Sequence, residues 1–180
     1  VKVSHCAFVA QWETWTDEQG NKIEGFKNEA GRADGEVKIE YKSGDCYEGF
    51  CVNGLLRGHG KLVWKDKGYY VGNWVDGNMD GFGVCKWNDT NDFYVGEWKD
   101  GKREGIGILQ KSDEKAEVAI WEDDEKVELL KAASLETEGV RSIYVSSNEK
   151  YADRAVIVYK DGSEYIGEIK VQKPDGWVVR

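Results

Sequence analysis

The sequence predicts an all-β fold, an elongated single-layer array of about six or seven consecutive antiparallel β-hairpins. Three observations support this prediction. A motif recurs at intervals of 23 to 25 residues, and Asp-Gly or Asn-Gly pairs separate runs of alternating residues. The composition, with 22 Gly, one Pro, eight Trp and nine Tyr among 180 residues, provides many turns and a core made of rings.

The motif is clearest in residues 70–83, YVGNWVDGNMDGFG, and in residues 94–107, YVGEWKDGKREGIG. Both follow the pattern Tyr-x-Gly-x-Trp-x-Asp-Gly-x-x-x-Gly-x-Gly. One period earlier, residues 47–62 (YEGFCVNGLLRGHGKL) keep the Tyr and most glycine positions. A repeat of this length indicates a row of supersecondary units, each packed on its neighbours. Continued in both directions, the register places unit starts at residues 23, 47, 70, 94, 117, 140 and 165.

Each unit is predicted to be a β-hairpin. Tyr70, Gly72 and Trp74 alternate with other residues and so share one face of an extended strand. The Asp-Gly pair at 76–77 is a strong hairpin-turn signal, and a second alternating run follows it. Glycine weakens a strand, so Gly72 and Gly83 indicate that a backbone or a ring from an adjacent unit packs directly on them.

The copies at residues 47–110 resemble the MORN repeat (membrane occupation and recognition nexus), whose pattern is close to Tyr-x-Gly-x-Trp-x-x-Gly-x-x-x-Gly-x-Gly. The resemblance implies a rod-like or gently curved array of hairpins. It implies no single activity, because the family includes scaffolds, membrane-contact proteins and modules attached to enzymes. The outer units depart from the pattern: Cys51 and Ile169 replace a Trp, and Ala119 and Ser142 replace a glycine.

We expect residues 1–180 to form one continuous array. It divides into a degenerate N-terminal repeat or cap (1–46), clear MORN-like repeats (47–110), an acidic degenerate segment (111–138) and degenerate C-terminal repeats (139–180). In the acidic segment the repeat register predicts strands, whereas the apolar spacing of DDEKVELLKAAS (123–134) favours a short helix or an irregular insert. The spacing favours the helix or insert slightly, and both alternatives stay open at this point.

Two surfaces are candidate binding sites. The first is an aromatic groove formed by Tyr47, Trp64, Tyr70, Trp74, Trp87, Tyr94 and Trp98. The alternative is that these rings form the core, because each can bury about 150–250 Å². The second is an acidic docking patch formed by Glu122, Asp123, Asp124 and Glu125. The net charge is −9, and this patch is suited to a basic protein partner, although an acidic solvated face is the simpler interpretation.

The sequence predicts no catalytic site, no cofactor and no metal. Its four cysteines include no Cys-x-x-Cys pair, and its two histidines, His5 and His59, have the wrong spacing for zinc. The thiols are expected to be reduced. The glycines are explained by the repeat and form no phosphate-binding loop. Nucleic-acid binding is not expected, since a basic stripe is lacking.

We therefore expect a non-catalytic protein-interaction or scaffolding module, with an unidentified protein partner and with self-association through open edge strands. One alternative is a phospholipid-binding module, which the net charge disfavours. Another is a regulatory module attached to an enzyme outside these residues, such as a lipid kinase or a SET-type methyltransferase. The expected location is cytoplasmic, with cytoskeletal or membrane association, because the sequence contains no signal-peptide pattern and no long apolar run.

Overall fold

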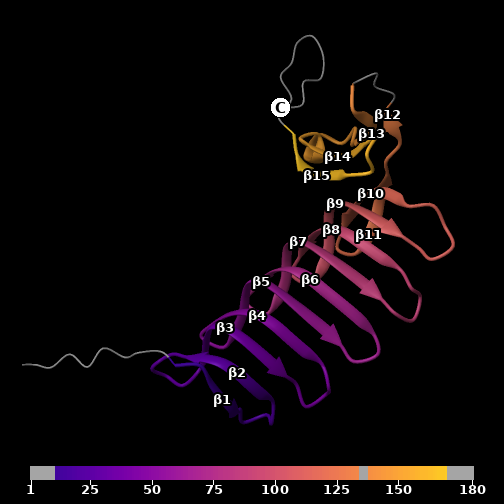
Figure 1. Cartoon of the computed structure of the whole chain (residues 1–180). Helices are drawn as coiled ribbons and strands as arrows, with labels where there is room; N and C mark the ends of the chain where they lie inside the picture. Colours follow the sequence, from indigo (N-terminus) through magenta and orange to yellow (C-terminus); the bar gives the residue numbers. More distant parts are fainter. Residues whose placement is uncertain (1–10, 134–137, 170–180) are drawn as a thin grey trace, which may run out of the picture.

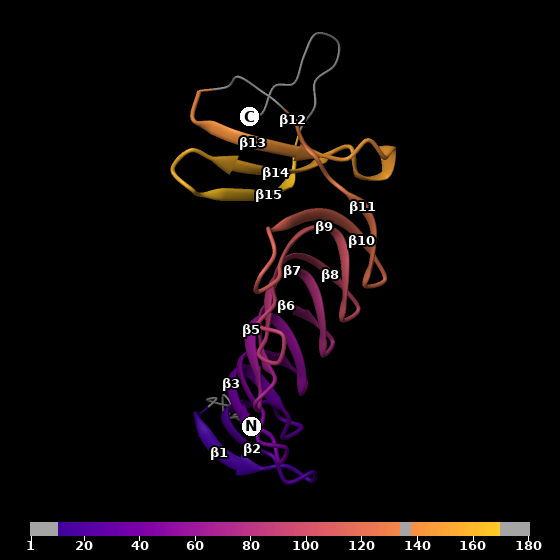
Figure 2. The same cartoon turned by 90° about the vertical axis from the view of Figure 1, so that its right-hand side faces the viewer.

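The computed structural model describes residues 11–133 and 138–169, which form two antiparallel β-sheets (Figures 1 and 2). The first sheet has eleven strands: β1 (Glu13–Thr16), β2 (Lys22–Lys27), β3 (Ala33–Glu40), β4 (Cys46–Val52), β5 (Leu55–Trp64), β6 (Gly68–Val75), β7 (Asn78–Trp87), β8 (Phe93–Lys99), β9 (Lys102–Gln110), β10 (Glu117–Glu122) and β11 (Glu125–Leu129). The second sheet has four: β12 (Ala132–Ala133), β13 (Val140–Val145), β14 (Arg154–Tyr159) and β15 (Glu164–Glu168). A 3-10 helix, η1 (Glu149–Tyr151), lies between β13 and β14.

The strands of the first sheet pair in chain order from β1 to β11, each antiparallel to the next, and the second sheet is ordered β12 to β15 in the same way. The predicted all-β row of consecutive hairpins is therefore confirmed. Figure 1 shows the first sheet as a long curved ribbon with β1 and β11 at its two ends. No helix among the described residues is long and apolar enough to cross a bilayer.

The Asp-Gly turns close the hairpins as the sequence predicts. Asp76 and Gly77 have φ values of 48° and 90°, the left-handed pair that a tight hairpin turn requires. The Gly77 N–H donates to the Leu56 carbonyl of the preceding unit, with an N–O distance of 3.0 Å. At the opposite margin of the sheet, the Lys65 N–H donates to Asp45 Oδ1 at 2.7 Å. Hydrogen bonds thus join the turns of neighbouring hairpins along both margins.

The helix or irregular insert favoured for residues 123–134 is wrong for its described part, residues 123–133. Asp123 and Asp124 have φ values of 50° and 73° and form the turn between β10 and β11. The apolar spacing favoured a helix because Val127 and Leu130 fit a helical stripe. The segment forms a strand instead, because β10 offers an open backbone edge with which it pairs. The alternative based on the repeat register is the correct one. Residue 134 lies outside the described residues.

A ladder of six aromatic rings forms the core on one face of the first sheet, here called the inner face. Trp74 and Trp98 each stand edge-on between the Tyr of their own hairpin and the Tyr of the preceding one, whereas Trp121 contacts only Tyr94 of the preceding hairpin; ring centroids are 5.1 to 5.7 Å apart. This T-shaped arrangement is favourable for the ring quadrupoles. The ladder consists, in spatial order, of Tyr47, Trp74, Tyr70, Trp98, Tyr94 and Trp121.

Glycines lie under the three tyrosine rings of the ladder. The three heavy atoms nearest to a Cβ added at Gly83 all belong to the Tyr70 ring, and an added Cβ at Gly72 would also approach Gly83 Cα to 2.6 Å. The prediction that a ring and a backbone exclude a Cβ here is therefore correct. Its detail is wrong, because the ring comes from the same hairpin rather than from an adjacent unit. Tyr70 folds back over its own strand, since its hydroxyl donates to the Asn73 carbonyl at 3.0 Å.

Neighbouring units supply the next layer of contacts. The Trp74 indole N–H donates to the Gly60 carbonyl at 3.2 Å, and the Trp98 indole N–H donates to the Gly83 carbonyl at 3.4 Å. Trp121 is equally buried, but its indole N–H has no hydrogen-bond partner among the described residues. The Trp-to-carbonyl bond therefore does not extend to the last hairpin of the first sheet.

The second sheet packs on the opposite, outer face of the first sheet, against β9 and β10. Ile106 and Ile108 from β9 form a buried cluster with Val118 and Ile120 from β10 and with Val156 from β14. An ion pair between Arg154 and Glu97, and one between Lys150 and Glu122 with a nitrogen–oxygen distance of 2.9 Å, flank this apolar contact. The two sheets are thus joined by a small hydrophobic core with charged margins.

We predict that Gly83→Ala destabilises the protein by about 1–3 kcal/mol, the usual cost of forcing a methyl group into filled space. In a Tyr70→Ala background the same change should cost much less, because the ring that occupies the space is gone. Urea unfolding of the four proteins in this double-mutant cycle measures the coupling. Equal costs in both backgrounds would contradict the proposed collision.

We also predict that Trp98→Phe costs more than Trp121→Phe. Both changes shorten a buried ring, but only the first removes a hydrogen bond, for which about 0.5–1.5 kcal/mol is typical. Urea midpoints at constant m-value give the comparison. A larger loss for Trp121→Phe would show that the indole N–H bond is not important for the ladder.

Candidate binding groove

The seven rings of the predicted aromatic groove fall into two groups. Tyr47, Tyr70, Trp74, Tyr94 and Trp98 are at most 4 % exposed and belong to the ladder. Trp64 and Trp87 pack against the same core but remain partly exposed. Only these two rings can contact a partner directly, and the other five support the surface from below.

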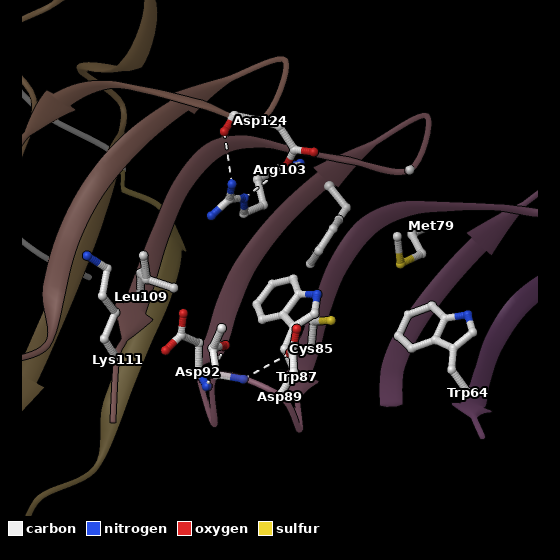
Figure 3. Close-up of a pocket in the computed structure, with 13 residues that line it drawn as sticks. Trp64, Met79, Cys85, Trp87, Asp89, Asp92, Arg103, Leu109, Lys111 and Asp124 are labelled. Carbon is white, nitrogen blue, oxygen red and sulfur yellow. Dashed lines mark hydrogen bonds and ion pairs between the residues drawn. The ribbon is translucent and has the colours of Figure 1, made fainter. Parts of the chain in front are cut away.

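Trp64 and Trp87 line a cleft of about 610 Å³ on the inner face (Figure 3). Both stand at the end of the second strand of a hairpin, 17 residues after the Tyr that starts their unit. Lys111 occupies the equivalent position of the next unit and continues the same wall. The repeat period therefore places one side chain per hairpin along this side of the cleft.

The opposite wall is built by the same rule. Met79 and Arg103 each lie nine residues after the first Tyr of their unit, just beyond the hairpin turn. The floor contains Cys85 and Leu109, both 15 residues into their units, together with the edge of Trp98. A groove along the array axis is therefore a consequence of the repeat, and its chemistry is set by the variable residues in these positions.

Sequence reasoning missed Met79, Arg103, Lys111 and Leu109, because it searched for aromatic residues alone. The repeat itself contains a signal for them. Each of the four occupies the same position in its repeat unit as another groove-lining residue does in a neighbouring unit. In this surface, Met79, from the same strand as Trp87, adds an adaptable apolar contact on the opposite wall.

Arg103 is held in place at one end of the groove. Its Nε donates to Asp124 Oδ1 at 2.8 Å, and its guanidinium lies 4.0 Å from the centre of the Trp121 ring. The backbone N–H of Arg103 donates to the same carboxylate oxygen at 3.0 Å. Arg103 is thus fixed by a cation–π contact and a salt bridge, and it forms a rigid end to the apolar part of the groove.

The acidic docking patch lies at the β10–β11 turn, and most of its charge is already paired within the chain. Asp124 pairs with Arg103, Asp123 pairs with Lys102 at 3.0 Å, and Glu122 pairs with Lys150. The hydrogen bond from Lys150, followed by that from Tyr151, lowers the pKa of the Glu122 carboxyl below its ordinary value. Glu125 has no salt-bridge partner in the described part of the chain. Docking of a basic partner here stays a prediction.

Two of the cysteines are buried in the core. Burial raises the pKa of the Cys51 thiol to about 11 and that of the Cys85 thiol to about 12. Such thiols stay protonated at neutral pH and are poor nucleophiles. Cys46 is partly exposed, and Cys6 lies outside the described residues. In residues 11–133 and 138–169, no group of His, Cys, Asp and Glu side chains is arranged to hold a metal ion.

The geometry defines the class of protein: a β-hairpin repeat array with an aromatic ladder core and an open groove above it. Comparison with family models finds a match, over the central part of the chain. Residues 47–69, 70–91 and 94–114 match the MORN repeat, so the chain contains three consecutive MORN repeats. They include five of the six rings of the ladder, all except Trp121, and the residues named above for both walls of the groove. No curated protein matches the chain.

We predict that the free energy of unfolding falls as pH rises from 9 to 10. The thiols of Cys51 and Cys85 have an ordinary pKa of 9.0, raised by burial in the folded protein. The contribution of these thiols to the free energy of unfolding is therefore fully present below pH 9. It is lost as the pH rises toward the pKa values that the thiols have in the folded protein. Each thiol can contribute a slope of at most about 1.4 kcal/mol per pH unit.

A Cys51→Ala/Cys85→Ala double variant should flatten this decline, as measured by urea unfolding at intervals of pH. The buried tyrosines are also raised in pKa, but their ordinary value is 10.0, so they act mainly above this window. An unchanged slope in the double variant would show that the thiols do not cause the decline.

Proposed function

We propose that this chain is a non-catalytic protein-binding module that holds a segment of a partner protein in the groove. The observation that carries the proposal is the pair of partly exposed rings, Trp64 and Trp87, along one wall of an open cleft, with Met79 on the opposite wall. Tryptophan is the residue most enriched at binding hot spots, and here it stands on a rigid core. Binding to such a surface requires little rearrangement of the module.

The charges around the groove favour a partner with an apolar anchor flanked by a cation. Asp89 and Asp92 lie at the Trp87 end of the wall and form no salt bridge within the described residues. The cations of the groove are already paired, Arg103 with Asp124 and Lys111 with Glu114. The negative charge available to a ligand therefore exceeds the positive charge, which agrees with the basic partner expected from the sequence.

The same reasoning argues against a phospholipid headgroup as the main ligand, because anionic headgroups need clustered cations that are free to bind them. A role as a regulatory module attached to an enzyme is compatible with the proposal. In that case the groove would hold either the partner or the catalytic domain itself. The proposal assigns no catalytic role to the MORN repeats.

We predict that peptides selected from a random phage-displayed library on the immobilised protein share an apolar or aromatic residue next to Lys or Arg. Binding of the best peptide should weaken about tenfold or more in a Trp64→Ala/Trp87→Ala variant, a loss of roughly 1.4 kcal/mol. Trp12→Ala is the matched control, because this exposed ring lies outside the groove. Calorimetric titration measures all three affinities.

Equal affinity in the groove variant and the wild type would contradict the proposal. A second contradiction would be flotation with vesicles containing phosphatidylinositol phosphates that is lost in the same variant, since this would assign the groove to lipid. The circular dichroism of each variant confirms that the array is folded.

A further inference from the structure

The outer face of the first sheet carries an apolar row that continues beyond the second sheet. Ile108 in β9 is paired with Val95 in β8, Val95 with Val84 in β7, and Val84 with Val71 in β6. The second sheet buries Ile108, whereas the three valines remain only half-buried. The row is therefore one hydrophobic surface of which only the C-terminal end is covered.

Neighbouring positions widen this surface. Val63 and Phe82 are 38 % and 40 % exposed, and Tyr69 and Phe93 are partly exposed. We call the uncovered surface the outer strip, consisting of Val63, Tyr69, Val71, Phe82, Val84, Phe93 and Val95. A contiguous exposed apolar surface of this kind is unusual for a chain of net charge −9 and is typical of an interaction site.

Two lysines lie within the outer strip. Lys61 extends the row of valines, since it is paired with Val71, and Lys86 is paired with Tyr69 on one side and Phe93 on the other. Neither has a salt-bridge partner among the described residues, whereas Lys38 earlier in the same row pairs with Glu48. A ligand with carboxylates at its margins would complement these cations.

The second sheet limits the shape of the ligand. Its strands β14 and β15 lie against β9, and Arg154 reaches Glu97 in β8. In Figures 1 and 2, β15 is the strand of the second sheet that lies nearest to the first sheet. Packed sheets are about 10 Å apart, so the second sheet forms a step beside the outer strip. A second flat array would collide with this step, whereas a single extended segment fits beside it.

We propose that the outer strip binds an extended segment of a partner protein, which lies beside β15 with aliphatic side chains on Val71, Val84 and Val95 and with carboxylates near Lys61 and Lys86. The segment continues the packing that β14 and β15 already make on the same face. This surface lies on the opposite face from the groove and is independent of it.

The test uses the whole chain with methyl-labelled valine and two capped peptides, Glu-Val-Glu-Val-Glu-Val-Glu and its counterpart with Lys in place of every Glu. The acidic peptide should produce saturable NMR shifts of the methyl groups of Val71, Val84 and Val95. The basic peptide should bind at least tenfold more weakly. Val84→Asp should abolish binding of the acidic peptide.

A charge-reversed variant, Lys61→Glu/Lys86→Glu, keeps the test decisive if Val84→Asp does not fold. It changes two side chains that are not part of the core, and it should reverse the preference toward the basic peptide. Absence of methyl shifts, equal binding of both peptides, or shifts confined to the Trp64 and Trp87 indole signals would overturn the proposal.

Two further results would also overturn the proposal by assigning the outer strip to another occupant. A concentration-dependent dimer in sedimentation that Val84→Asp dissociates would assign it to a second copy of the chain. Acidic-peptide binding that appears only when the chain is cut after Ile169 would assign it to residues 170–180. A Trp64→Ala/Trp87→Ala variant should bind the acidic peptide normally, so failure of the groove proposal is distinguishable from failure here.

Discussion

The edge-on packing of tyrosine and tryptophan rings is the interaction on which the rest of the structure depends. Trp74 and Trp98 each touch the Tyr of their own hairpin and the Tyr of the one before, so a single type of contact holds a unit together and joins it to its neighbour. The ring of Tyr70 can lie this low only because Gly72 and Gly83 beneath it lack a Cβ. The Tyr and glycine positions of the repeat are thus parts of one packing requirement.

This requirement also explains where binding chemistry can vary. The ladder fixes one face of every first strand, which leaves the position before each inter-unit turn and the position after each hairpin turn free to differ. Those positions form the groove walls, where one unit has Met79 and the next has Arg103. Stability therefore depends on the shared residues of the repeat, and the recognition that we propose depends on the residues that are not shared.

Much of the fold could be predicted because the repeat encodes it locally. The Tyr-x-Gly-x-Trp strand and the Asp-Gly turn are both short-range signals, and pairing in chain order follows from them. The segment around Val127 and Leu130 was misread because its apolar spacing is compatible with a helix and with a strand. The deciding factor was the open edge of β10, which is a tertiary feature.

The candidate site was less predictable for the same reason. In sequence, Trp74 and Trp87 are both aromatic residues in alternating strands, but only the former packs between two tyrosine rings and becomes buried. The acidic patch could not be assessed from composition, because the lysine that pairs with Glu122 is 28 residues away. Long-range pairing of charges leaves no local signal.

The hydrogen bonds between successive turns have a consequence for how such a chain can change in length. Because the bond from Gly77 to Leu56 is repeated one period later by that from Gly101 to Met79, the two junctions between the three MORN repeats are held by the same hydrogen bond. Duplication or loss of one whole period of 23 or 24 residues would recreate an identical junction, whereas an insertion of a few residues within a strand would break it. The unit that can be gained or lost in evolution is accordingly the complete hairpin, and related proteins should differ by whole numbers of hairpins.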